Sequence, residues 1–103
     1  MIKIVPILPH NYAIDFVAIG QKKYEWQNSD LKKTILKKIR SIKGIEWVNC
    51  WGRSKTDQAK NFTEIEIRVA IKFKTTKEKK QEEILEEIKN WLELQFITIN
   101  ANK

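Results

Sequence analysis

Glycine and histidine are scarce in this chain, and their scarcity excludes several kinds of enzyme. Its 103 residues include three glycines, too few for a P-loop or for the GxGxxG turn of a dinucleotide-binding fold. The one histidine, His10, follows Pro9 in an expected loop and has no serine or cysteine partner in a catalytic context. We therefore expect a protein without catalytic activity.

Cysteine and long apolar runs are also missing. Cys50 is the only cysteine, so no intramolecular disulfide can form, and no cluster of cysteine and histidine offers a zinc site. We therefore expect no metal and no cofactor. The N-terminal stretch MIKIVPILPHNY is interrupted by two prolines, and no run reaches the roughly 18 apolar residues of a membrane span. These absences favour a cytoplasmic protein that does not enter a membrane.

The hydrophobic pattern predicts one α+β domain over residues 1–103. Short apolar and β-branched runs predict four strands, at residues 12–19, 45–51, 62–74 and 94–99. Residues 1–11 form an N-terminal arm or, over residues 2–8, an extra strand in which Pro6 suits an edge position.

Two helices lie between these strands. Residues 28–30 are capping types and Gly44 is the expected left-handed stop of the first helix, while Thr75 and Glu78 form a capping box for the second. The apolar stripe of the first helix is Leu31, Ile35, Leu36, Ile39 and Ile42. The stripe of the second is Ile84, Leu85, Ile88, Trp91 and Leu92.

The order strand, helix, strand, strand, helix, strand resembles the ferredoxin-like βαββαβ sandwich over residues 12–99. The resemblance implies an antiparallel sheet with two helices on one face. Segment 62–74 supports this arrangement because it alternates strictly, with an apolar row of Ile65, Ile67, Val69, Ile71 and Phe73. This fold hosts many functions, so function must be argued from a site.

The helix-free face of the expected sheet is partly apolar. In strand 45–51 we expect Trp47 and Trp51 to join Ile45 in the core, because that face is the more apolar of the two. The helix-free face then receives Ala13, Asp15, Val17, Ile19, Val48, Cys50, Ala70 and either Phe96 or Ile97. Such a patch indicates an interface. Either the N-terminal segment covers it, or two copies stack as a homodimer.

The net charge of +7 is concentrated in one part of the chain. Residues 22–60 hold eleven Lys and Arg against four Asp and Glu, whereas residues 77–93 hold four Lys against six Glu. On the first helix Lys33, Lys37 and Arg40 follow one another at i, i+4 and i+7, opposite the apolar stripe. A solvated helix face usually mixes both signs, because like charges at this spacing repel.

Two loops are expected at the same end of the sheet as the start of the first helix. The loop 21–28 carries Lys22, Lys23, Tyr24 and Trp26, and the hairpin 52–61 carries Arg53, Lys55 and Lys60. Cations follow phosphates and aromatic faces stack bases, which are the requirements of a single-strand site. Tyr24 and Trp26 either stack bases or pack inward.

Two functions from different classes fit these features. The first is a non-catalytic nucleic-acid-binding protein for single-stranded or structured RNA or DNA, contacting phosphates through Lys22, Lys23, Lys33, Lys37, Arg40, Arg53, Lys55 and Lys60. The second is a small protein-interaction module or inhibitor, of viral or mobile-element origin, which docks its basic side on an acidic partner surface.

Overall fold

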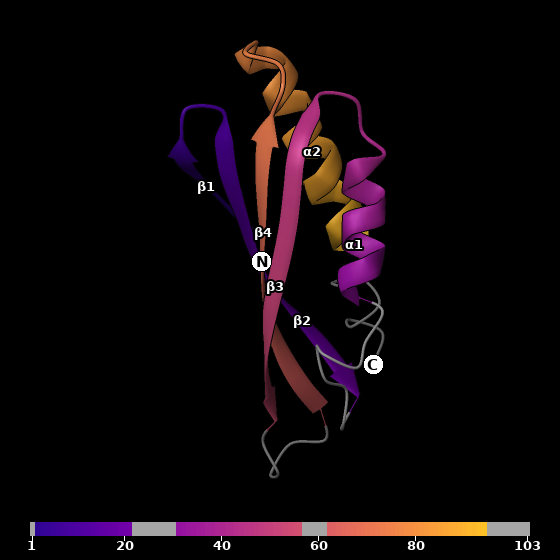
Figure 1. Ribbon diagram of the computed structural model, residues 1–103. Helices are drawn as coiled ribbons and strands as arrows, with labels where there is room; N and C mark the ends of the chain where they lie inside the picture. Colours follow the sequence, from indigo (N-terminus) through magenta and orange to yellow (C-terminus); the bar gives the residue numbers. More distant parts are fainter. Residues whose placement is uncertain (1, 22–30, 57–61, 95–103) are drawn as a thin grey trace.

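The computed structural model describes residues 2–21, 31–56 and 62–94. Within them the elements are β1 Lys3–Leu8, β2 Asn11–Gln21, α1 Leu31–Arg40, β3 Ile45–Thr56, β4 Phe62–Phe73 and α2 Glu78–Leu92. The strands form one antiparallel sheet in the order β1-β2-β4-β3, with the helices packed on one face (Figure 1). The α+β fold class is confirmed, and the arrangement is consistent with a ferredoxin-like sandwich.

The N-terminal segment is a strand, and it occupies an edge of the sheet. β1 pairs with β2 and contains Pro6, which matches the expectation that this proline suits an edge strand. This edge beside β2 is the position of the last strand in a βαββαβ sandwich. Of the strand predicted at 94–99, Leu94 lies instead in a helical turn after α2, and residues 95–99 are outside the described part of the chain.

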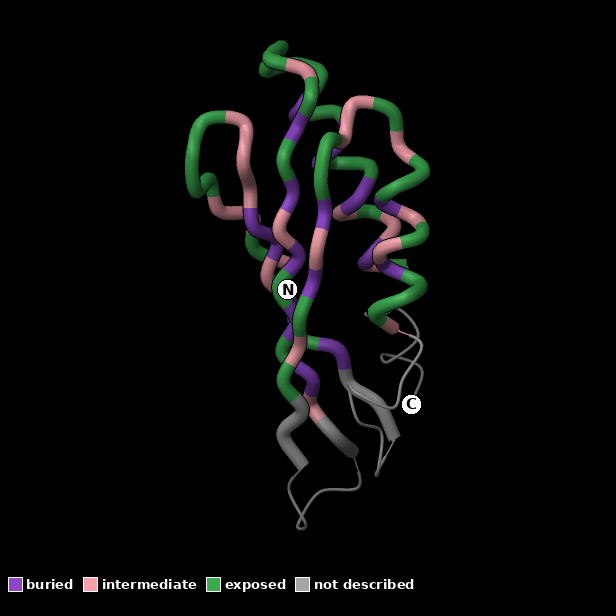
Figure 2. The backbone as a smooth tube through the Cα atoms, in the orientation of Figure 1, coloured by how far each residue is buried: buried purple, intermediate pink, exposed green. Residues whose placement is uncertain are grey.

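The core lies between the sheet and the helices. The whole apolar row of β4 is buried, with no member more than 4% exposed. Ile35 and Ile39 of α1 are also fully buried, as are Ile88 and Leu92 of α2. Figure 2 shows this alternation of buried and exposed positions along the central strands. Each such aliphatic side chain contributes about 1.5–3 kcal/mol by leaving water, so these periodic rows supply most of the hydrophobic stabilisation.

The predicted orientation of β3 is wrong. Val48 and Cys50 are buried on the helix side, whereas Trp47 and Trp51 are 50% and 48% exposed on the opposite face. The cause is a bulge: Ile45 pairs with Phe73 but Trp47 pairs with the next residue, Lys72, so Glu46 is an extra residue. A bulge of this kind inverts the side-chain alternation of the strand that follows.

The β3–β4 hairpin is longer than the sequence predicts. β3 continues to Thr56, where it pairs with Thr63, so Arg53 and Lys55 belong to the strand and not to a loop. The prediction ended β3 at residue 51 because residues 52–56 are polar. An edge strand tolerates polar residues, because it has a hydrogen-bonding partner on one side only.

The predicted stop of the first helix and the predicted start of the second are both corrected by the structure. Gly44 has the expected positive φ, +97°, but α1 ends at Arg40, so this glycine lies in the turn that joins α1 to β3. A Cβ added there would lie 3.1 Å from Ile84 Cδ1. The capping box is wrong: α2 begins at Glu78, and its N-cap Lys77 makes no side-chain cap. Thr75 Oγ1 instead accepts a hydrogen bond from the Lys77 backbone N–H, in the turn before the helix.

Gln81 of α2 makes polar contacts with the β1–β2 hairpin. It is 1% exposed, and its Nε2 donates to Thr75 O at 2.7 Å and lies 2.8 Å from His10 Nδ1. Its Oε1 accepts a hydrogen bond from the Tyr12 hydroxyl at 3.3 Å. His10 has φ 67°, and its backbone carbonyl accepts the Phe73 N–H. The buried Gln81 amide thus joins α2 to the hairpin turn, to β2 and to the turn that precedes the helix.

Replacing Gln81 with alanine is expected to lower the free energy of unfolding by about 1–3 kcal/mol, because buried polar partners lose their hydrogen bonds. Urea unfolding followed by circular dichroism measures the change. Lys80→Ala, at an exposed neighbouring position of the same helix, is the control and should change stability by less than about 0.5 kcal/mol. Equal losses for the two variants would show that the Gln81 network contributes nothing specific.

Candidate functional site

The side of the sheet opposite the helices, here called the open face, carries a row of side chains that crosses all four strands. The strand register aligns Lys3 of β1, Asp15 of β2, Arg68 of β4 and Trp51 of β3. The neighbouring row contains Val17, Glu66 and Arg53. Side chains directly opposite one another in antiparallel strands lie close together, so these two rows form one continuous surface.

Asp15 and Arg68 form a two-pronged ion pair at the centre of this row. Arg68 Nε donates to Asp15 Oδ1 at 2.7 Å, and Nη2 donates to Oδ2 at 2.8 Å. The hydrogen bonds from Arg68 to Asp15, together with the negative charge of the carboxylate, raise the pKa of Arg68. Both Asp15 oxygens are engaged, and no group of three or more metal-binding side chains assembles within the described ranges.

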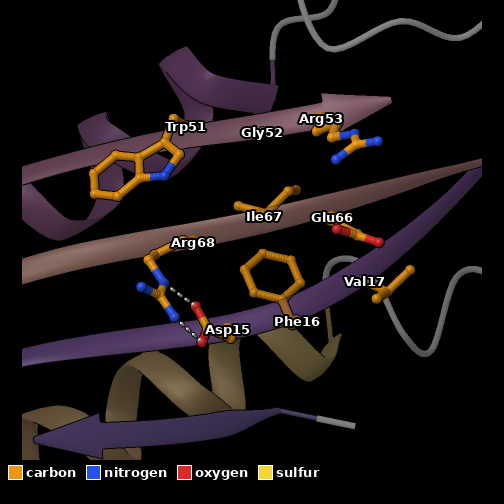
Figure 3. Close-up of a pocket in the computed structure, with 9 residues that line it drawn as sticks. All are labelled: Asp15, Phe16, Val17, Trp51, Gly52, Arg53, Glu66, Ile67 and Arg68. Atoms are coloured by element: carbon orange, nitrogen blue, oxygen red, sulfur yellow. Dashed lines mark hydrogen bonds and ion pairs between the residues drawn. The ribbon is translucent and has the colours of Figure 1, made fainter. Parts of the chain in front are cut away.

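Trp51 borders a depression of about 460 Å³ on the open face. Its lining comes from β2, β3 and β4 and includes Arg53, Arg68 and Val17. Figure 3 shows the Trp51 indole and the Arg68 guanidinium on neighbouring strands, with Asp15 holding the guanidinium from the other side. Trp47 lies further along β3, opposite Lys72. The depression therefore has, side by side, an aromatic surface and a guanidinium plane that makes two hydrogen bonds to Asp15.

Positive charges on the open face lie opposite carboxylates. Arg68 pairs with Asp15, Lys72 Nζ lies 3.0 Å from Glu46 Oε2, and Arg53 is opposite Glu66 in the ladder. Exposed pairs of this kind contribute little to stability, because water and dissolved salt screen their charges. Their importance here is that they leave this part of the surface with little excess charge of either sign.

The outer side of α1 has a large excess of positive charge. Its ten residues, LKKTILKKIR, hold five cations and no acid. Lys33, Lys37 and Arg40 are all exposed, and none of the three forms an ion pair or hydrogen bond within the described residues. The predicted cationic ridge is therefore exposed, and no carboxylate of residues 2–21, 31–56 or 62–94 forms an ion pair with it.

Two further lysines extend this ridge. Lys43 lies in the turn after α1, and the Lys74 backbone N–H donates to Gly44 O at 2.7 Å, which places Lys74 beside the turn that joins α1 to β3. Both lysine side chains are exposed. We call Lys33, Lys37, Arg40, Lys43 and Lys74 the cationic ridge. Sequence reasoning did not include Lys43, and it missed Lys74 because this residue is thirty positions from Gly44 and only the folded sheet brings the two together.

The predicted rim is only partly within the described residues. Lys22, Lys23, Tyr24, Trp26 and Lys60 lie outside them, and for Lys55 only the backbone is described. The ends of β2 and β3 do lie together, as predicted, because Gln21 pairs with Phe62 and Thr56 with Thr63. Arg53, however, projects from the open face, on the opposite side of the sheet from the cationic ridge.

The start of α1 lies away from that end of the sheet. Cys50 Sγ lies 3.9 Å from Lys32 O, so the first turn of α1 is level with Cys50. Six further residues of β3 extend beyond this level to Thr56, a length of about 20 Å that Figure 1 shows below α1. The cationic ridge is therefore level with the half of β3 that carries Trp47 and Trp51.

Comparisons with family models, curated proteins and solved structures find no match to this chain. In the described part, neither helix is long and apolar enough to cross a membrane.

Cys50, between α1 and the sheet, makes stability depend on pH in the alkaline range. Burial raises the pKa of its thiol, and the charges of Lys32 and Arg40 oppose this effect more weakly. The neutral thiol therefore stabilises the folded state below about pH 8.5, the pKa of an unfolded cysteine, and this contribution is lost as the pH rises.

The wild-type protein should consequently lose stability more steeply between pH 8 and pH 10 than Cys50→Ala, which has no thiol to ionise. Urea unfolding at several pH values measures both curves. All other ionisable groups are the same in both proteins, so their contributions cancel in the difference. Parallel pH profiles would contradict the prediction.

Proposed function

We propose that this protein binds nucleic acid without catalysing a reaction, and that the cationic ridge contacts phosphates. The observation that carries the proposal is the unbalanced charge of α1. Like charges four residues apart on a helix repel, so five cations without an acid cost stability in the free protein. A polyanion relieves this repulsion and releases its own counterions when it binds.

The size of the ridge sets the strength of the expected salt dependence. With a rise of 1.5 Å per residue, Lys33 to Arg40 spans about 10 Å along the helix, and Lys43 and Lys74 continue beyond it. Five phosphate contacts predict a slope of log affinity against log salt of about −3.5 for a single strand and −4.5 for duplex DNA. The cations of residues 22–23 and 55–60, and Arg53, would add to this value.

The predictions for Tyr24, for Trp26 and for the cellular location remain part of this proposal. Tyr24 and Trp26 would stack bases if they face the solvent, and a cytoplasmic location would bring the protein to its ligand. An acidic protein surface is the other polyanion that the ridge would fit. We place nucleic acid first because phosphates repeat along a polymer, as the cations repeat along α1.

Replacing Lys33, Lys37 and Arg40 together with alanine should reduce the salt slope by about two to three and weaken binding at low salt. Fluorescence anisotropy of labelled oligonucleotides at four or more salt concentrations measures both quantities. The matched control replaces Lys79, Lys80 and Lys89 of α2, which changes the net charge by the same amount. Because glutamates surround these lysines, we expect the control to retain most of the slope.

Two outcomes would contradict the proposal. If the wild-type protein at micromolar concentration binds no oligonucleotide at low salt, the ridge does not serve nucleic acid, and an acidic protein partner becomes the better explanation. If both triple variants lose the same slope, binding follows the net charge of the protein and not the ridge.

A further inference from the structure

The exposure of Trp47 and Trp51 is unusual for a domain with such a small core. Tryptophan is highly buried on average, yet these two are half exposed while smaller side chains, Val48 and Cys50, are buried on the helix side. The bulge at Glu46 determines which β3 side chains face the helices and which face the solvent. Bulges often re-aim side chains beside binding sites, and two exposed indoles on one strand indicate a ligand with flat apolar surfaces.

The depression beside Trp51 has the chemistry of a base-stacking site. Bases stack on indole rings and on the planes of arginine guanidinium groups. Trp51 supplies the first surface, and Arg68 supplies the second, held in place by its two hydrogen bonds to Asp15 (Figure 3). Because the guanidinium is already fixed, little conformational entropy is lost when a base packs against it.

The charge of the open face fits bases better than phosphates. Its central cations lie opposite carboxylates, as described above, whereas the cations on α1 have no ion-pair partner among the described residues. The free edge of β3 is also partly closed, because the Cys50 backbone N–H donates to the Asn49 side chain at 2.9 Å and not to another strand. Strand addition is thus disfavoured at this point, and the face itself is the better docking surface.

We infer that the open face binds unpaired bases at Trp51 and Trp47, and that the ligand is consequently a single-stranded nucleic acid. The inference rests on the proposed function, whose ridge would contact the phosphates of the same strand. β3 and α1 together separate the two surfaces, because the ridge lies on the outer side of α1 and the tryptophans lie on the open face of β3. A flexible single strand passes around this edge, whereas the bases of a stiff duplex are stacked inside and do not reach the indoles.

The variant Trp51→Ala tests base binding at the open face independently of phosphate binding at the cationic ridge. The probes are a fluorescein-labelled 12-mer of oligothymidylate, a 12-mer of the same length without bases, and a 12-base-pair duplex. We expect Trp51→Ala to weaken oligothymidylate binding about 5- to 150-fold, the range found for loss of one stacked base. The salt slope should stay unchanged, because no phosphate contact is lost. The wild type should bind the base-free 12-mer more weakly than Trp51→Ala binds oligothymidylate, because the base-free probe also lacks a base at Trp47.

Two control variants test whether stacking is responsible. Trp51→Phe keeps an aromatic face and should retain most of the affinity. Ile7→Ala removes an exposed apolar side chain, 53% exposed, from β1 and should leave binding unchanged. Circular dichroism and urea unfolding test whether each variant folds. We expect the Trp51 variants to fold, because this side chain is half exposed.

The inference and the proposed function fail in different ways. If the wild type binds with a steep salt slope but Trp51→Ala binds equally tightly, the base site is overturned and phosphate binding by the ridge stands. Equal affinity of the wild type for duplex and single strand also overturns the inference. So does a dimer that Trp51→Ala converts to monomer and that oligothymidylate leaves intact, because the open face would then be occupied by a second copy.

Discussion

One extra residue in an edge strand determines which surface this molecule presents. Without the bulge at Glu46, the alternation that begins at Ile45 would bury Trp47 and leave Val48 and Cys50 on the open face. With it, the small side chains fill the space beneath α1, where Cys50 Sγ meets the Lys32 carbonyl. The tryptophans are then displaced to the other side of the sheet. The close packing of α1 on β3 and the aromatic open face thus have the same physical origin.

The parts of the fold that were predictable are those with an unbroken period. Segment 62–74 alternates without exception over its apolar row, and both helical stripes repeat every 3.6 residues, so these elements and their buried faces follow from the sequence. β3 was unpredictable for a specific reason. Its residues IEWVNCW contain apolar side chains in both phases, and only pairing with β4 shows where the phase changes. The capping box failed because Thr75 was already engaged in a turn.

The candidate site was predictable in composition but not in placement. The excess of cations on α1 follows directly from LKKTILKKIR, and their exposure agrees with the helical period. Lys74 joins them only through a hydrogen bond to Gly44, thirty residues away. The Asp15–Arg68 pair likewise joins residues 53 positions apart, in strands that are neighbours only in the folded sheet. Contacts between distant segments carry no local pattern, so no reading of the chain alone would have found them.

The cationic ridge and the tryptophans of the open face lie on opposite sides of β3. Only a limited class of ligands is able to contact both surfaces at once. A globular acidic partner would meet either the ridge or the open face, because its rigid surface cannot bend around a strand edge. A dimer through the open face would have to bury the charged rows formed by Asp15, Arg68, Arg53 and Glu66, whereas interface centres are depleted of charge. A single-stranded nucleic acid has neither difficulty. It is flexible, its phosphates and bases point in different directions, and it therefore matches a protein edge that has cations on one side and tryptophans on the other.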